Sequence, residues 1–170
     1  MIYFKPKHFK ASYGSHIPIL VKLVSMTSGP IMELGVGFFS TPVLHWLCAP
    51  TKRKLVSYES NVSYYEMAKN YITPWHDVRL IDNWDDLDLS ERWNIIFIDH
   101  GPGIRRNTEM VRVANVADYV IVHDTEAKSD WHYNYSKAFH LYKYRCDYKK
   151  TYPETSVLSN FHDLDGVCEL

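Results

Sequence analysis

Two pairs of acidic and histidine residues stand directly after apolar runs of the chain. Asp99 and His100 follow the apolar segment 94–98, and His123 and Asp124 follow the apolar segment 119–122. A charged pair beside a buried segment costs free energy unless something uses the charge. If the two segments are neighbouring strands, both carboxylates lie at one edge of a sheet. They could then hold a hard divalent cation such as Mg²⁺, orient a substrate hydroxyl or cap helices, and these alternatives stay open.

These pairs supply the candidates for chemistry. Asp99, His100 and His123 are the candidate catalytic residues, acting as bases or as groups that orient a hydroxyl. Asp99 and Asp124 are the candidate metal ligands. His16 is a weaker catalytic candidate: it follows the segment 13–15, which could cover a bound ligand, but a histidine on a helix surface needs no chemical role.

A turn with two glycines, Glu33-Leu34-Gly35-Val36-Gly37, follows another apolar run. Glycine lacks a Cβ, so Gly35 and Gly37 permit a tight turn and let the backbone approach a ligand. Ser40 or Thr41 is expected to cap the helix that follows. The third glycine of the dinucleotide fingerprint is absent, and Glu33 precedes the first glycine by two positions. Both details favour a ligand with a cationic amino-acid end over one with a pyrophosphate.

Two further polar positions suit a nucleoside. Glu59 ends the next apolar segment, about 20 residues after the glycine turn, where dinucleotide folds place an acid on the ribose hydroxyls. Ser60 stands beside it and is expected to contact the same ligand. Asn83 and Trp84 follow the third apolar segment, and an amide beside an aromatic ring suits adenine. The alternative for this pair is a solvated acidic loop.

The elements that must position these residues alternate along the chain. Strands are predicted over 31–34, 54–58, 77–81, 94–98, 119–122, 142–150 and 155–160. Helices are predicted over 15–26 (with Ser15 as N-cap), 41–48, 61–71, 105–116 and 128–140. This alternation predicts an α/β fold, a doubly wound Rossmann-like, mostly parallel seven-stranded sheet with an antiparallel C-terminal hairpin. Ligands of such sheets bind at the carboxyl ends of the strands, where every motif above falls.

Composition restricts the class of protein. The 170 residues suit a single domain over 1–170, and 46% hydrophobic residues can build a core. The net charge of −1 makes a nucleic-acid partner unlikely, and no apolar run is long enough for a membrane helix. Three widely spaced cysteines and an N-terminal segment without a signal-peptide pattern predict reduced thiols in a cytoplasmic, unprocessed protein.

Together these residues resemble class I S-adenosylmethionine (SAM) dependent methyltransferases, over about residues 15–122. The turn 33–37 is similar to the glycine-rich SAM motif of that family, and Glu59 to its ribose-binding acid. The stretch 95–100, Ile-Ile-Phe-Ile-Asp-His, resembles the strand-four motif of catechol-type O-methyltransferases. In those enzymes the matching aspartate binds Mg²⁺ beside the methyl donor, and the matching histidine lies near the adenine. The pair 123–124 is similar in placement to their second metal-binding pair.

The resemblance departs at one position. Pro102 stands where the catechol-type enzymes carry a catalytic lysine, so that residue of their mechanism has no match here. The Gly-Pro-Gly sequence followed by Arg105 and Arg106 resembles some sugar-directed O-methyltransferases.

The resemblance implies a SAM-dependent methyltransferase that O-methylates a small hydroxylated molecule or a sugar, with SAM and, as an option, Mg²⁺ as cofactors. The alternative is a SAM- or nucleotide-binding module without transferase activity. An NAD-dependent oxidoreductase is disfavoured by the missing third glycine. The expected partner is a small-molecule methyl acceptor, and the edge strands are compatible with a homodimer.

Overall fold

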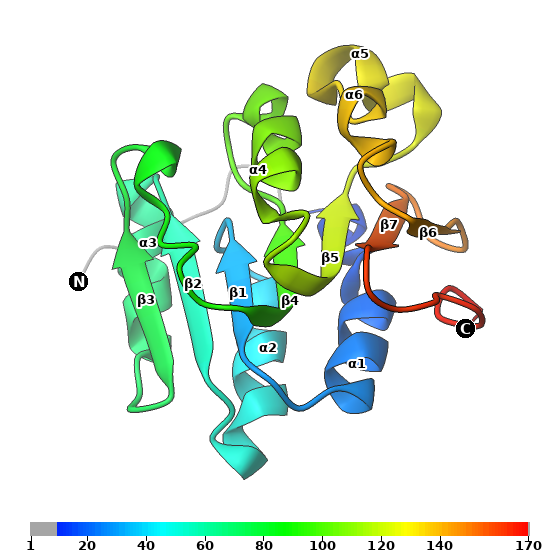
Figure 1. The fold of residues 1–170 in the computed structure, drawn as a ribbon. Helices are drawn as coiled ribbons and strands as arrows, with labels where there is room; N and C mark the ends of the chain where they lie inside the picture. Colours follow the sequence, from blue (N-terminus) through cyan, green and yellow to red (C-terminus); the bar gives the residue numbers. More distant parts are fainter. Residues whose placement is uncertain (1–9, 170) are drawn as a thin grey trace.

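A seven-stranded sheet runs through the computed structural model, which describes residues 10–169 (Figure 1). The strand order is β3-β2-β1-β4-β5-β7-β6. The strands are β1 (Ile31–Leu34), β2 (Leu55–Glu59), β3 (His76–Leu80), β4 (Trp93–Ile98), β5 (Ala117–His123), β6 (Tyr144–Tyr148) and β7 (Thr155–Ser159). Strands β1 to β5 pair in parallel, and β7 pairs antiparallel with both β5 and β6. The predicted doubly wound, mostly parallel sheet with an antiparallel C-terminal hairpin is confirmed.

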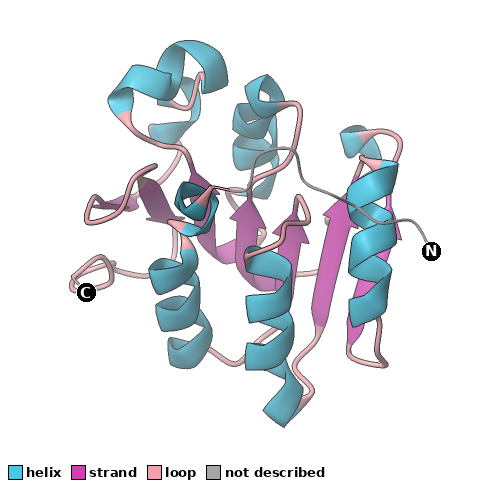
Figure 2. Cartoon of the chain, turned by 180° about the vertical axis from the view of Figure 1, so that it is seen from behind, coloured by secondary structure: helices cyan, strands magenta, loops and turns pink. Residues whose placement is uncertain are grey.

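Helices cover both faces of this sheet (Figures 1 and 2). The face in front in Figure 2 carries α1 (Ile17–Met26), α2 (Ser40–Cys48) and α3 (Val62–Ala68). The other side carries α4 (Arg106–Val113), α5 (Asp130–Tyr133) and α6 (Ser136–Phe139). Short 3-10 turns are η1 (Ala11–Gly14), η2 (Ala49–Thr51), η3 (Lys69–Tyr71), η4 (Trp84–Asp86), η5 (Gly103–Arg105) and η6 (Ala127–Ser129).

The core has one apolar layer on each face, because successive strand residues point to opposite faces. The layer under α1 and α2 contains Ile31, Leu55, Ile95, Phe97 and Ile121. The layer under α4 and α6 contains Met32, Leu34, Val56, Ile96, Ile98, Val120 and Val122. Buried on both faces, the central strands read in the sequence as uninterrupted apolar runs rather than as alternating patterns. They hold the carboxyl ends of β1, β2, β4 and β5 at one edge.

Two predicted helices are shorter than expected. The helix predicted over 105–116 begins with η5 and ends at Val113. The helix predicted over 128–140 is two short helices, because Asn134 between them has left-handed backbone, with φ of 56°. The Asp130 carboxylate stabilises the second helix by accepting hydrogen bonds from the backbone and hydroxyl of Ser136.

The predicted helix caps are wrong. Helix α1 has His16 at its N-cap, and the Ser15 hydroxyl binds other elements, described below. Helix α2 has Phe39 at its N-cap, without a capping bond from the side chain, so neither Ser40 nor Thr41 caps it. The Ser40 and Thr41 hydroxyls make tertiary contacts instead, and local sequence preferences do not reveal such contacts.

The expectation that all cysteines are reduced is wrong in the structure. Cys146 in β6 and Cys168 near the C-terminus form a disulfide, and the buried Cys48 is free. The two bonded residues are 22 positions apart, and the chain must fold back on β6 to bring them together. Spacing alone did not show this pairing.

No helix within residues 10–169 is long and apolar enough to cross a membrane. The N-terminal segment 1–8, on which the expectation of an unprocessed protein rested, lies outside the described residues.

Candidate functional site

A cavity of 690 Å³ opens at the carboxyl ends of β1, β2, β4 and β5. Its β1–β2 half is lined by Val36, Gly37, Phe38, Ser40, Glu59, Ser60, Asn61 and Tyr64. Its β4–β5 half is lined by His16, Asp99, Arg106, His123, Asp124, Tyr133 and Pro153. The structure thus brings together the predicted residues Gly37, Ser40, Glu59, Ser60, Asp99, His100, His123 and Asp124. The predicted residues Glu33, Gly35, Thr41, Asn83 and Trp84 do not line the cavity.

The glycine turn is fixed by its contact with the end of β4. Gly35 has φ of 98°, and a Cβ on it would lie 2.6 Å from backbone atoms of His100. No other residue type fits both the conformation and the space. The next backbone N–H groups are held as well, Val36 by the Glu59 carboxylate at 2.9 Å and Gly37 by the Thr41 hydroxyl at 3.0 Å. The turn therefore presents a fixed backbone to the cavity.

Glu33 lies beneath this turn and is fully buried. Its carboxyl group accepts hydrogen bonds from the hydroxyls of Thr41, at 3.0 Å, and Ser57, at 2.5 Å. Burial raises the pKa of Glu33 to about 7, although the hydrogen bonds from Ser40, Ser57 and Thr41 oppose the rise. Glu33 and Thr41 therefore support the turn from below and do not reach the cavity, contrary to the predicted role in contacting a ligand.

Glu33 is expected to make the protein less stable as pH rises. Its folded pKa of about 7 exceeds the ordinary 4.5, so the folded state binds more protons than the unfolded state between these values. The free energy of unfolding then falls by up to about 3 kcal/mol over that window. In Glu33→Gln this contribution is absent, so the variant should gain stability relative to wild type from pH 5 to pH 8. Urea unfolding at several pH values measures this difference in the free energy of unfolding. Exposed Glu66→Gln is the control, and a constant difference between Glu33→Gln and wild type would contradict the expectation.

Glu59 closes the β1–β2 half of the cavity. Its carboxylate accepts three backbone hydrogen bonds, from Val36 at 2.9 Å, Ser60 at 2.8 Å and Asn61 at 2.7 Å. Burial raises the pKa of Glu59, and these bonds partly offset the rise. Glu59 thus links the glycine turn to the start of α3 while lining the cavity.

The predicted adenine pair Asn83 and Trp84 has a structural role instead. The Asn83 side chain accepts a hydrogen bond from the backbone of Asp85, and Asn83 does not line the cavity. The Trp84 ring is 4% exposed and stacks on the His100 ring at 4.1 Å, and its Nε1 donates to the Gly101 carbonyl at 3.0 Å. Trp84 therefore supports the loop after β4 from behind.

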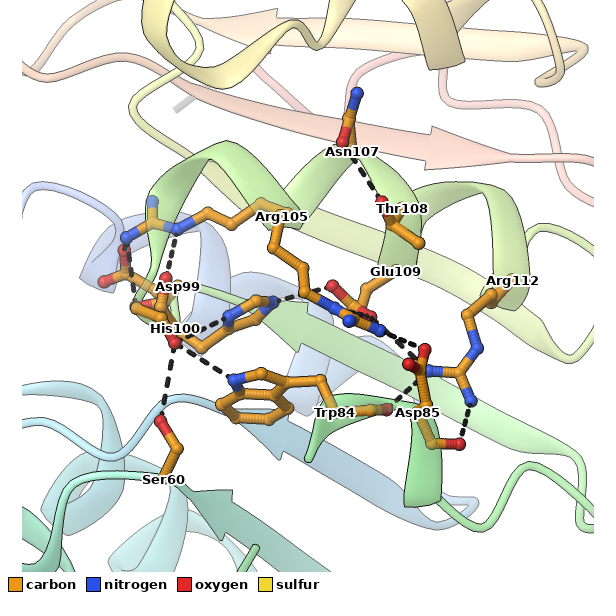
Figure 3. A network of polar contacts seen from close by, with 12 residues as sticks. Ser60, Trp84, Asp85, Asp99, His100, Arg105, Asn107, Thr108, Glu109 and Arg112 are labelled. Atoms are coloured by element: carbon orange, nitrogen blue, oxygen red, sulfur yellow. Dashed lines mark hydrogen bonds and ion pairs between the residues drawn. The ribbon is translucent and has the colours of Figure 1, made fainter. Parts of the chain in front are cut away.

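His100, a predicted catalytic residue, belongs to the cavity lining, but its ring points between Trp84 and Glu109 (Figure 3). Its ring is 1% exposed and lies between Trp84 and Glu109, with Nε2 at 3.1 Å from Glu109 Oε2. A ring enclosed in this way cannot reach a substrate. The proposed catalytic role of His100 is corrected to a packing role.

A charged network behind this loop was not predicted. Glu109, fully buried, accepts hydrogen bonds from Arg105 at 3.1 Å and from Arg112 at 3.4 Å, and Arg105 also binds Asp85 (Figure 3). Arginines four residues before and three residues after the glutamate share one helix face. The spacing of these charges in 105–112 was the sequence signal that could have predicted the network.

Arg106 occupies the space between the two predicted metal ligands. Its Nη2 lies 2.9 Å from Asp99 Oδ1, and its Nη1 lies 2.9 Å from Asp124 Oδ2. Of the remaining guanidinium hydrogens, two bind the backbone carbonyls of His100 and Asp99, and Nη1 also donates to the Tyr135 hydroxyl at 3.4 Å. A guanidinium cation therefore bridges these carboxylates, where the prediction placed Mg²⁺.

His123 is held as an imidazolium by its partners. The one hydrogen of the Ser15 hydroxyl is donated to the Pro153 carbonyl at 2.8 Å, so Ser15 must accept from His123 Nε2, also at 2.8 Å. His123 Nδ1 faces the Asp99 carboxylate at 3.3 Å, which can only accept. Burial alone would lower the pKa of His123, but the neighbouring Asp99 raises it overall. In this arrangement both ring nitrogens of His123 face hydrogen-bond acceptors, which favours the imidazolium, and the predicted role as a base requires one of these contacts to open.

The charges of the four ionised side chains in this half of the cavity therefore cancel. Burial alone would raise the pKa of Asp99, but Arg106 and His123 hold it well below its usual range. Two carboxylates, Asp99 and Asp124, face two cations, Arg106 and His123. Tyr133 completes the cluster by donating to Asp124 at 2.9 Å.

His16 is the neutral member of the β4–β5 half. It is 2% exposed, and within residues 10–169 neither ring nitrogen has a hydrogen-bond partner. Burial and the neighbouring His123 lower the pKa of His16 to about 3. Its ring packs on Phe97, with centroids 4.8 Å apart, and meets the His123 ring at 4.7 Å in a T-shaped arrangement. The cavity lining thus includes a buried, neutral imidazole whose acceptor nitrogen has an unused lone pair.

Comparison with known proteins gives the class of fold. No family model and no curated protein sequence matches the chain. The O-methyltransferase from Bacillus cereus in complex with SAH superposes with a TM-score of 0.63 at 14% identity, over 91% of this chain and 84% of that one. Cofactor-bound Rv0187 from MTB superposes with a TM-score of 0.66 at 14% identity, over 94% of this chain and 85% of that one.

This chain has a seven-stranded Rossmann-like sheet and shares its fold with these structures, one of which is a methyltransferase. The CcbJ methyltransferase from Streptomyces caelestis matches at 17% identity and a TM-score of 0.49, over 68% of this chain. The chain spans about half of that protein, 52% of its length. Identities at this level define the fold alone.

Proposed function

We propose that the protein is a SAM-dependent methyltransferase. The observation that carries the proposal is the cavity itself: in a methyltransferase fold, it joins a glycine turn and a buried acid at one end to a polar cluster at the other. Methyl transfer needs these two neighbouring compartments, one for the donor and one for the acceptor.

The β1–β2 half fits the donor. A cavity of 690 Å³ is in the usual range for pockets that enclose a small molecule. Gly37 lets a ligand approach the backbone, and Glu59 Oε2, which accepts only the Val36 bond, keeps a lone pair for a ribose hydroxyl. Ser60 and Asn61 extend the same wall toward the nucleoside. When bound, SAM supplies a methyl group on a sulfonium centre.

The β4–β5 half favours a transferase over a binding module without activity. A module that has lost its acceptor site would be filled by aromatic side chains beside Asp99. Here that space is open and lined by polar groups, namely His16, Arg106, His123 and Asp124. The acceptor we propose is a small hydroxylated molecule or a sugar, whose hydroxyls match such a lining.

The contribution of these residues is chiefly to orient the acceptor. His123 already carries both protons, and the paired Asp99 is a weak base. His16 lines the cavity, but both of its ring nitrogens are buried, so the ring must turn toward the cavity before it accepts a hydrogen bond from an acceptor hydroxyl. Holding the hydroxyl oxygen in line with the methyl group supplies most of the rate enhancement that such a site offers.

Thermal unfolding with SAM and S-adenosylhomocysteine tests the proposal. Ligand at about 100 times its Kd should stabilise the protein by about 2.7 kcal/mol, or about 5 to 10 °C. Glu59→Ala should lower the starting Tm, because three backbone N–H groups lose their acceptor, and should also lose the ligand-induced shift. Exposed Glu66→Ala on α3 is the matched control and should keep it. Failure of both ligands to shift the wild-type Tm would overturn the proposal, and a shift with ATP alone would favour a nucleotide-binding module.

A further inference from the structure

Three potential metal ligands converge in the β4–β5 half of the cavity. One ligand atom from each of His16, Asp99 and His123 lies within 4.8 Å of the others. Asp99 Oδ2 and His123 Nδ1 are 3.3 Å apart. Two ligands that share a zinc-sized ion, each about 2.1 Å from it, lie about 3 to 3.4 Å apart. Two of the three ligand atoms therefore already have the required separation, and a small movement of His16 brings in the third.

The surrounding contacts orient these ligand atoms. Ser15 accepts from His123 Nε2 and donates to Pro153, which leaves Nδ1 toward the cluster. Arg106 binds Asp99 Oδ1 at 2.9 Å, which leaves Oδ2 toward the same point. Metal-binding histidines and carboxylates are typically fixed by such hydrogen bonds on their other atoms.

His16 supplies the independent observation. A buried imidazole without a hydrogen-bond partner is costly unless something satisfies it. Its ring packs against Phe97 and His123, so its nitrogens lie beside the cluster without being held by a hydrogen bond. A metal ion at the centre of the cluster would bind a His16 nitrogen and so supply its missing partner.

We propose that His16, Asp99 and His123 bind a divalent transition-metal ion, which takes the place of the proton on His123 Nδ1. Two imidazoles and one carboxylate suit Zn²⁺, Co²⁺ or Fe²⁺ rather than Mg²⁺, which prefers oxygen ligands. Arg106 stays on the other oxygen of Asp99 and on Asp124. Because all three ligands line the cavity, the remaining coordination positions face it. Binding of an acceptor hydroxyl there rests on the proposed function, whereas binding of the ion does not.

Titration of the chelator-treated protein with Co²⁺, followed by its visible absorption, tests the site. Wild type should bind one equivalent, Zn²⁺ should displace it, and excess Mg²⁺ should not. His16→Phe keeps a ring against Phe97 but removes both nitrogens, and it should weaken Co²⁺ binding about 100-fold or more. Asp99→Asn should weaken it too. His132→Phe, at an exposed histidine of α5, is the matched control and should bind as wild type does.

Circular dichroism of each variant shows whether it is folded, and SAH binding is measured on the same samples. Absence of Co²⁺ binding by folded wild type, or equal binding by wild type and folded His16→Phe, would overturn the site. Displacement of Co²⁺ by Mg²⁺ would also overturn it, since it would indicate an oxygen-ligand site. SAH binding without metal binding would leave the proposed function standing, which separates the two failures.

Discussion

Replacing Arg106 with methionine is expected to destabilise the protein by about 3 to 5 kcal/mol. The guanidinium is buried and binds two carboxylates at 2.9 Å each. Methionine fills similar volume but leaves Asp99 and Asp124 without that cation in a desolvated site, and an uncompensated buried charge is costly. Urea unfolding at pH 7 gives the difference in free energy. Such a loss is a large part of the total stability of a typical domain.

Two controls separate the charge effect from lost packing. Arg79→Met removes a half-exposed partner of Asp77 and should cost less than about 1 kcal/mol. The double variant Arg106→Met/Asp124→Asn should recover part of the loss, because one unpaired charge is gone. Equal destabilisation by Arg106→Met and Arg79→Met would show that the buried cluster has no special energetic role.

The destabilisation by Arg106→Met should also depend on pH. Arg106 helps to hold the pKa of Asp99 below its usual range, so the wild-type pairing contributes stability above the ordinary aspartate pKa and loses it as pH falls. The difference between wild type and variant should therefore be largest near neutral pH and shrink in acid.

Replacing Gly35 with alanine is expected to cost at least about 3 kcal/mol and to abolish the SAM binding proposed above. Alanine at φ of 98° is strained, and its Cβ would lie 2.6 Å from backbone atoms of His100. Backbone of the sheet edge cannot move as a flexible side chain can, so the end of β1 must separate from the end of β4. The glycine turn, with Val36 and Gly37, would move with it. Urea unfolding and the SAH-induced Tm shift measure the two effects.

Gly166→Ala is the matched control for this prediction. Gly166 also has positive φ, 71°, but no heavy atom lies within 4 Å of the position of an added Cβ. This variant should show only the conformational cost, about 1 kcal/mol, and should keep the SAH-induced shift. A Gly35→Ala protein as stable as Gly166→Ala would show that the close approach to His100 is not essential.

The sequence alone was enough to predict the sheet and its order of elements. Central strands such as β1 and β4 are buried on both faces, so their apolar runs are visible without any tertiary information. The glycine turn was visible for a similarly local reason, since Gly35 meets a backbone requirement that few residues satisfy. Glu59 could be placed because strand ends in this fold class share one edge of the sheet.

Only the tertiary structure decided which polar side chains face the cavity. Asp99 and His100 are neighbours in the chain, yet Asp99 lines the cavity with its carboxylate near Arg106, while the His100 ring packs against Trp84 and Glu109. The direction of a side chain after the last residue of a strand depends on what packs around it, and here that is a tryptophan from another loop.

The same holds for the charges of the site. Ser15 and His123 are 108 residues apart, and the proton count of His123 follows only from the contact between them. Arg106 bridges the two predicted metal ligands because a helix begins beside two strand ends. Local patterns determine elements through backbone preference and burial, whereas protonation and ion pairing depend on groups that meet only after the chain has folded.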